Sequence, residues 1–197
     1  MQECCLTADD LACRRGDRVL FRGLSLALAP AGALQVLGAN GIGKSSLLRI
    51  LAGLLRPFAG SVASLGAIGL IDEHPALDPH LPLGSALAFW QRLDGPAGEA
   101  VAVLGLSSLL DVPVRYLSTG QKKRAALARL IGQRAPIWLL DEPLNGLDRD
   151  AAALTQGLAA QHCASGGICV IASHQTFSLP GMKTLTLADH AREEIGA

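Results

Sequence analysis

Residues 38–46 read Gly-Ala-Asn-Gly-Ile-Gly-Lys-Ser-Ser and match the phosphate-binding pattern G-x-x-x-x-G-K-[ST]. The glycines let the backbone wrap closely around an anion and aim several N–H groups at it. Lys44 can reach the outer phosphates, and the hydroxyl of Ser45 can hold magnesium. An apolar strand is expected over 33–37 before this loop, and a helix over 44–55 after it. Because a helix start attracts anions, the segment predicts a nucleoside triphosphate site.

Length and charge narrow the classes of protein that remain. A chain of 197 residues suits one compact α/β domain, and its 17 basic residues balance its 17 acidic ones, so charge gives no indication of nucleic-acid binding. No apolar run approaches the roughly 18 residues of a membrane-spanning helix, and the first ten residues lack the features of a signal peptide. The five cysteines include no C-x-x-C pair. We therefore expect a cytoplasmic chain that reaches a membrane only through partner subunits.

The order of the predicted elements indicates the fold. Alternating runs around 6–13 and 19–28 predict an antiparallel hairpin, and further strands are expected over 61–71, 137–140, 168–172 and 183–188. Helices are expected over 83–111, with a break at 94–96, over 120–132 and over 150–161. This alternation predicts an α/β P-loop fold with a mostly parallel sheet, an N-terminal antiparallel β part and a small inserted helical lobe. The whole of 1–197 would form a single domain, with 1–77 and 133–197 as the nucleotide-binding core and about 78–132 as the helical subdomain.

Acidic and imidazole side chains follow two of the buried strands. Asp141 ends the apolar run 137–140 and can hold magnesium through water, while Glu142 can orient or deprotonate an attacking water. His174 follows the strand 168–172 at a similar offset and can hydrogen-bond a terminal phosphate. Solvated acids and a structural histidine are the alternative interpretation. The phosphate loop upstream favours the catalytic one.

A third element, Leu-Ser-Thr-Gly-Gln at 117–121, lies directly before a predicted helix. Ser118 can serve as its N-cap. The basic run 122–124 then occupies the first turn, where the helix dipole disfavours cations. Such a start indicates an anion nearby, although a solvated basic face is an equally simple interpretation of the run alone.

Together these motifs resemble a known family. The segments 38–46, 117–121, 139–147 and 173–174 occur in the order and spacing of an ABC-type ATPase subunit, and the resemblance covers nearly the whole chain. It implies that ATP and Mg²⁺ are sandwiched between two copies packed head to tail. Ser118 and Gly120 would cap the γ-phosphate bound by the partner's Lys44, and Asp148 would lie in the loop that couples the two sites.

Three positions depart from the family pattern. Arg15 stands where an adenine-stacking aromatic is usual, and an arginine plane can also stack on a base. His74 lies where the family has a glutamine that senses magnesium and contacts the membrane subunit. Thr119 replaces the commoner glycine.

The resemblance assigns the candidate site residues by role. Glu142 and His174 are the catalytic candidates, and Ser45, Asp141 and His74 the magnesium candidates. Nucleotide contacts are expected from Gly38, Ala39, Asn40, Gly41, Ile42, Gly43, Lys44, Ser45, Ser46, Arg15, Ser118, Gly120 and Gln121.

Within the family the chain is similar to the ATP-binding subunits of haem exporters in bacterial cytochrome c maturation, because of its short length, Trp138, Ser-His-Gln at 173–175 and the segment 11–25. The implied partners are a second copy and integral membrane subunits, at the inner face of the plasma membrane, and no nucleic acid. The alternatives are the ATPase of another small ABC transporter, a non-transport ABC protein that uses ATP as a dimerisation switch, a translation or DNA-repair ABC protein, and a P-loop kinase.

Overall fold

The computed structural model describes residues 4–97 and 99–191, so the ends of the predicted 1–197 domain and residue 98 lie outside the described residues. A three-stranded antiparallel sheet forms first, from β1 (Cys5–Arg15), β2 (Arg18–Leu28) and β4 (Ala59–Leu65), in the order β2-β1-β4. β1 and β2 form the predicted hairpin, joined by a turn in which Gly16 has a φ of +57°. The hairpin prediction is confirmed.

A five-stranded parallel sheet forms the centre of the molecule. Its order is β5-β6-β7-β3-β8, from β3 (Ala33–Leu37), β5 (Ile68–Ile71), β6 (Ile137–Asp141), β7 (Ile168–Ala172) and β8 (Lys183–Thr186). Since all neighbours pair in parallel, their carboxyl ends share one edge of the sheet. The loops that leave β3, β5, β6 and β7 at that edge carry most of the predicted site residues.

The described part of the chain has five α-helices: α1 (Lys44–Leu51), α2 (Leu83–Asp94), α3 (Ala100–Val103), α4 (Thr119–Gln133) and α5 (Arg149–Ala164). α1 ends four residues before the predicted position 55. The N–H of Gly53 bonds to the carbonyl of Ile50, and the N–H of Leu54 bonds to the carbonyl of Arg49. With Gly53 at a φ of +72°, this is a Schellman motif, which ends a helix whatever the apolar spacing beyond it.

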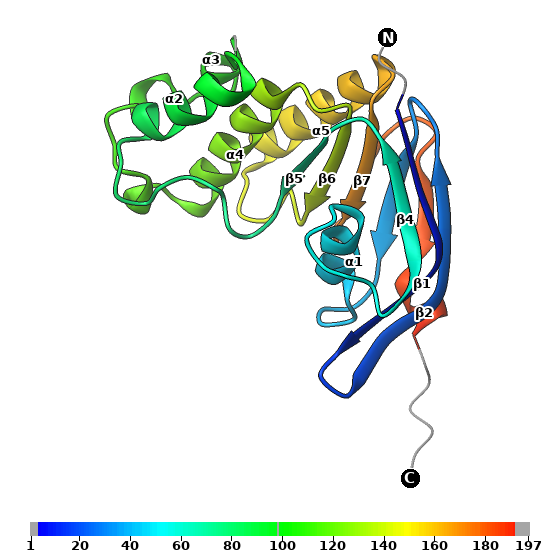
Figure 1. Cartoon of the computed structure of the whole chain (residues 1–197). Helices are drawn as coiled ribbons and strands as arrows, with labels where there is room; N and C mark the ends of the chain where they lie inside the picture. The colour runs from blue at the N-terminus through cyan, green and yellow to red at the C-terminus, as the bar shows by residue number, and fades with distance from the viewer. Residues whose placement is uncertain (1–3, 98, 192–197) are drawn as a thin grey trace.

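The parallel sheet separates two hydrophobic cores. Side chains alternate between its faces, so Trp138 and Leu140 pack toward α2–α5, whereas Ile137 and Leu139 pack toward α1 and the antiparallel sheet. Figure 1 shows α1 between the two sheets, with α2, α3 and α4 gathered on the other side. Among the described residues, no helix combines the length and apolarity needed to cross a bilayer.

Candidate functional site

The phosphate loop connects β3 to α1. Gly41 and Gly43 have φ values of +78° and +117°, which favour glycine. A Cβ added at Gly43 would lie 3.2 Å from the side chain of Leu20 on β2, whereas one at Gly41 would meet no atom within 4 Å. The loop is therefore packed at its base and open at its middle. Asn40 and Gly41 are exposed there, where an anion can approach the backbone N–H groups.

Lys44 places a buried positive charge at the base of this loop. Its Nζ donates to the carbonyls of Gly38 (2.8 Å) and Ala39 (3.3 Å) and lies 3.7 Å from Oε1 of Glu142. The side chain is 6% exposed. Because a buried ammonium requires partners, these contacts hold it at the base of the loop, next to the predicted catalytic carboxylate.

Asp141 and Ser45 provide the oxygen atoms of a candidate magnesium site. Burial raises the pKa of Asp141, and a hydrogen bond with Ser45 acts in the opposite direction. Within the described part of the chain, Oδ1 of Asp141 is buried without a hydrogen-bond partner. An unpaired buried carboxylate oxygen beside a hydroxyl fits a hard cation such as Mg²⁺. Across 4–97 and 99–191 no three His, Cys, Asp or Glu side chains gather as a metal cage.

His74 occupies a separate position after β5. Its backbone N–H donates to Oδ1 of Asp72 (2.9 Å), and Oδ2 of Asp72 forms an ion pair with Arg49 (3.0 Å). The His74 side chain is exposed and lines a hollow that also includes Pro75 and Arg129. No hydrogen bond or ion pair of the described residues joins His74 to Ser45 or Asp141.

Glu142 is surrounded by donors. Oε2 of its carboxylate lies 2.9 Å from Nδ1 of His174 and accepts from Oγ of Ser173 (3.3 Å) and from the backbone N–H of His174 (3.4 Å). Its backbone has a φ of +45°, a region that residues other than glycine seldom adopt. The structure thus brings Glu142, His174 and Lys44 together, as the motifs predict. The hydrogen bond from Ser173 to Glu142 was not predicted, although the position of Ser173 directly before His174 could have indicated it.

The 117–121 turn caps α4. Oγ of Ser118 accepts from the N–H of Gln121 (3.2 Å), and Oε1 of Gln121 accepts from the N–H of Ser118 (2.8 Å), which is a complete capping box. The Gln121 side chain is therefore turned toward its own helix, while Ser118 is exposed. A Cβ added at Gly120 would lie 2.5 Å from the carbonyl oxygen of Gly146, so the turn packs directly on the loop after β6.

Arg15 lies at the exposed tip of the β1–β2 hairpin. Burial raises the pKa of the neighbouring Cys13 thiol, while a hydrogen bond with Ser46 and the charge of Arg15 act in the opposite direction. These contacts place the hairpin tip near the start of α1. The position is compatible with a contact to a base, as the resemblance implies.

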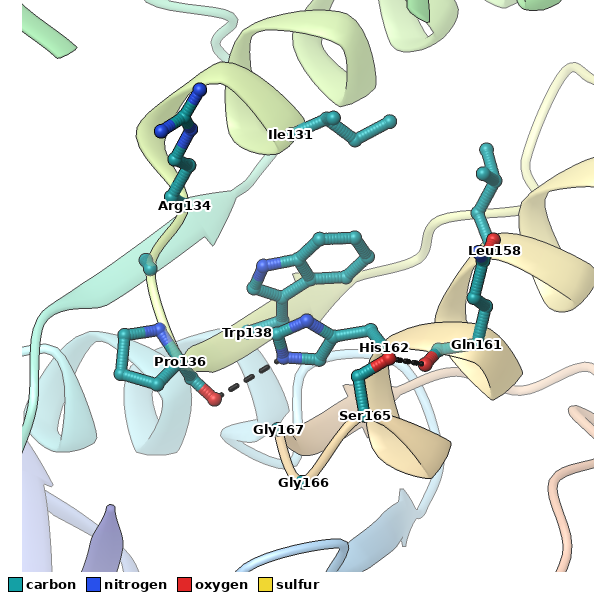
Figure 2. Close-up of a pocket in the computed structure, with 11 residues that line it drawn as sticks. Ile131, Arg134, Pro136, Trp138, Leu158, Gln161, His162, Ser165, Gly166 and Gly167 are labelled. Atoms are coloured by element: carbon teal, nitrogen blue, oxygen red, sulfur yellow. Dashed lines mark hydrogen bonds between the residues drawn. The ribbon is translucent and has the colours of Figure 1, made fainter. Parts of the chain in front are cut away.

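A second hollow lies at the opposite edge of the sheet (Figure 2). It has a volume of about 410 Å³ and is lined by the ends of α4 and α5 and the start of β6. Trp138 stacks on His162 with ring centroids 4.0 Å apart, and Nε2 of His162 lies 3.2 Å from the carbonyl oxygen of Pro136. Trp138, although it lies in the strand that ends at Asp141, therefore points into this hollow, not toward the phosphate loop.

Comparison with known proteins agrees with the geometry. A protein of Novosphingobium aromaticivorans named "Cytochrome c biogenesis ATP-binding export protein CcmA" is 62% identical over 187 residues, which span 95% of this chain and 97% of that protein. A protein of the same name from Zymomonas mobilis is 50% identical and covers 92% of this chain and 84% of its own length.

Solved structures show the same fold. A metal-chelate type ABC transporter in an inward-facing conformation has a TM-score of 0.78 at 24% identity, covering 93% of this chain and 80% of that one. The ATP-binding cassette MJ1267 in its ADP conformation has a TM-score of 0.71 at 19% identity, covering 89% and 83%. The predicted P-loop fold, with its parallel and antiparallel sheets, is confirmed. A family model described as ABC transporter matches residues 21–145, which is more than half of the sequence, and the chain therefore belongs to the ABC transporter family.

Proposed function

We propose that this chain is the ATP-binding and ATP-hydrolysing subunit of an ABC transporter complex, the haem exporter of bacterial c-type cytochrome biogenesis. The observation that carries this proposal is the 62% identity, over almost the full length of both chains, to the Novosphingobium protein named for ATP-binding export in cytochrome c biogenesis. Membership of the ABC family supports ATP as the substrate. The assignment to haem export rests on the sequence resemblance to haem exporters.

Binding of ATP would be the task of the phosphate loop. The exposed N–H groups around Gly41 and the amino end of α1 form an anion site, and Lys44 adds a full positive charge at its base. Ser45 and Asp141 would hold Mg²⁺, which when bound neutralises charge on the phosphate oxygens. Arg15 would face the base from the hairpin tip. His74 remains a candidate for a water-mediated contact to this site.

Hydrolysis would depend on Glu142. Its carboxylate is fixed by Ser173 and His174, so it can orient a water and accept its proton as that water attacks the terminal phosphorus and the P–O bond to the leaving ADP breaks. His174 is half exposed and can also donate to the phosphate. A carboxylate fixed before the substrate arrives loses little freedom during the reaction.

The exposed Ser118 turn would complete the site of a second copy. Two chains packed head to tail would place Ser118 and Gly120 of each chain on the ATP held by the other. The complex would include integral membrane subunits, with this chain peripheral on the cytoplasmic face of the bacterial plasma membrane. Within the chain, 78–132 would form a helical subdomain on a nucleotide-binding core made of 1–77 and 133–197.

The test compares magnesium-dependent ATP turnover of the full chain with that of Lys44→Ala, Glu142→Gln and Lys183→Met. We expect both site variants to lose at least about a hundredfold in turnover, because each removes a group that acts on the transferring phosphoryl. Lys183 lies on β8 and is exposed, so its variant should match the parent. Normal turnover in both site variants would refute the assigned roles.

The pathway is tested in cells. A strain that lacks this chain should lose c-type cytochromes, and the parent chain should restore them whereas Glu142→Gln should not. Unchanged cytochrome levels in the deletion strain would assign the ATPase to another transporter.

A further inference from the structure

Lys123 connects α4 to the end of β6. Its ammonium group donates a hydrogen bond to the backbone carbonyl of Glu142. The side chain is partly buried, and burial lowers the pKa of Lys123, while the negative charges of Glu142, Asp141 and Glu73 act in the opposite direction. A cation in this setting needs an acceptor. The Glu142 carbonyl supplies that acceptor, and it also accepts from the N–H of Asn145 (3.2 Å).

The backbone of Glu142, whose carbonyl accepts from Lys123, has an uncommon conformation. Glu142 has a φ of +45°, and its N–H donates to the carbonyl of Ala172 on β7 at 2.7 Å. Its backbone is therefore anchored on one side by β7 and on the other by α4. Because the direction of the Cα–Cβ bond follows from the backbone angles, these anchors set the direction in which the side chain leaves the backbone, and Ser173 and His174 then hold its carboxylate.

The same first turns of α4 form the part that would meet a second copy. Ser118 is exposed at the helix start, and Gly120 packs so closely on Gly146 that an added Cβ would lie 2.5 Å from its carbonyl oxygen. Lys123 follows Gly120 by three residues, on the same rigid helix. A displacement of the Ser118 turn therefore also displaces the backbone that carries the Lys123 ammonium group.

We propose that Lys123 is a positioning residue that ties the 117–121 turn, which would contact the partner's ATP, to the backbone of Glu142, which would act on the ATP of its own chain. The inference rests on the proposed function. It makes Lys123 a mechanical link between the two ATP sites of a dimer. Its role is to aim Glu142, and it does not touch the substrate.

The experiment measures kcat and KM for ATP, the binding of a fluorescent ATP analogue, and thermal unfolding of the full chain. Lys123→Met removes the side-chain donor, whereas Lys123→Arg and Lys123→Gln keep an N–H donor at this position. We expect Lys123→Met to lose about tenfold or more in kcat, with KM and analogue binding within about twofold of the parent. The Arg and Gln variants should retain most of the kcat, and Lys183→Met should match the parent.

A double-mutant cycle tests whether Lys123 acts through Glu142. In the Glu142→Gln background, Lys123→Met should cause no further loss of the residual rate, because the group that it positions is already disabled. The same fold-loss in both backgrounds would overturn the inference, as would an unchanged kcat in Lys123→Met. A raised KM with reduced thermal stability in all three Lys123 variants would assign the residue to folding alone. If Glu142→Gln itself turns over ATP normally, the proposed catalytic role of Glu142 is wrong. That result differs from a failure of the Lys123 inference alone, in which Glu142→Gln is inactive but Lys123→Met is not impaired.

Discussion

At Glu142 the backbone and the side chain are both constrained. The φ of +45° is unfavourable for a residue with a Cβ, yet the amide is held by Ala172 and the carboxylate by Ser173 and His174. An unfavourable backbone conformation is retained only where several surrounding contacts hold it in place, and such positions are concentrated at functional sites. The arrangement places one carboxylate oxygen 3.7 Å from the ammonium group of Lys44.

Gly120 gives a prediction at the same scale. In Gly120→Ala the new Cβ would lie 2.5 Å from the carbonyl oxygen of Gly146, so the first turn of α4 must shift. We expect the free energy of unfolding to fall by about 1–3 kcal/mol. Gly157→Ala is the matched control, since its Cβ meets no atom within 4 Å and the residue lies inside α5, where alanine should add about 0.5–1 kcal/mol. Urea denaturation measures both, and equal effects would contradict the close contact.

At the scale of single elements, the cap of α4 combines stability with the proposed function. Ser118→Ala removes the hydrogen bond from the Gln121 N–H to the Ser118 hydroxyl, which is one of the two bonds of the capping box. This change should reduce the free energy of unfolding by about 1 kcal/mol. Ser118→Asp keeps a capping oxygen and should leave the stability near that of the parent. It also adds a negative charge where the partner's phosphates would lie, so ATP turnover should fall sharply. Parent-like turnover in Ser118→Asp would argue against a phosphate contact at this turn.

His162 gives α5 and β6 a pH-dependent contact. Burial lowers its pKa, so between the lowered value and the ordinary value of about 6.5 the unfolded chain binds a proton that the native chain does not. Neutral His162 therefore contributes fully to the free energy of unfolding when the pH is above the ordinary pKa of about 6.5. This contribution declines as the pH falls toward the lowered pKa of the native chain.

His162→Phe keeps a ring against Trp138 but cannot titrate. The free energy of unfolding, measured in urea at about pH 7.5 and about pH 5.5, should fall less for this variant than for the parent. Each protein is compared with itself, so the hydrogen bond to Pro136 that the variant lacks does not affect the difference. An identical pH dependence would show that His162 titrates normally in the native chain.

Elements with a clear period could be predicted from the sequence. The hairpin and the strands β6 and β7 follow from alternation and from continuous apolar runs. The end of α1 could not be placed by period, because Leu54 and Leu55 continue the spacing while Gly53 ends the helix through backbone hydrogen bonds.

The candidate site shows the same division. The motifs indicated Lys44, Asp141 and Glu142 as candidates individually, because their residue types and spacing are those that phosphate and magnesium binding require. The bond from Lys123 to the Glu142 carbonyl and the stacking of Trp138 on His162 depend on how distant segments pack. Neither pair is close enough in the sequence to produce a periodic signal.

At the scale of the whole molecule, the parallel sheet concentrates chemistry at one edge. Its carboxyl ends bring the phosphate loop, Asp141, Glu142 and His174 together, whereas the hollow around Trp138 lies at the other edge. The Ser118 turn at the start of α4 is exposed, as the proposed contact with a second copy requires. The basic side chains of the first turn of α4, which the helix dipole disfavours, have acceptors within the chain, because Lys122, Lys123 and Arg124 donate to the backbone carbonyls of Arg115, Glu142 and Leu104.

Shared sites make a prediction about mixed dimers. Lys44→Ala and Ser118→Asp should each be inactive alone, because each damages both ATP sites of a symmetric pair. When the two variants are mixed, a heterodimer contains one site built from an intact Lys44 and the other chain's intact Ser118. Random pairing should therefore restore turnover to about a quarter of the parent value, since half of the dimers carry one intact site of two.

ATPase rates measured over a range of mixing ratios check this prediction. The control is Lys44→Ala mixed with Glu142→Gln, because those two residues belong to the same site and their heterodimer has no intact site. A Lys44→Ala and Ser118→Asp mixture no more active than this control would show that each chain builds its site alone.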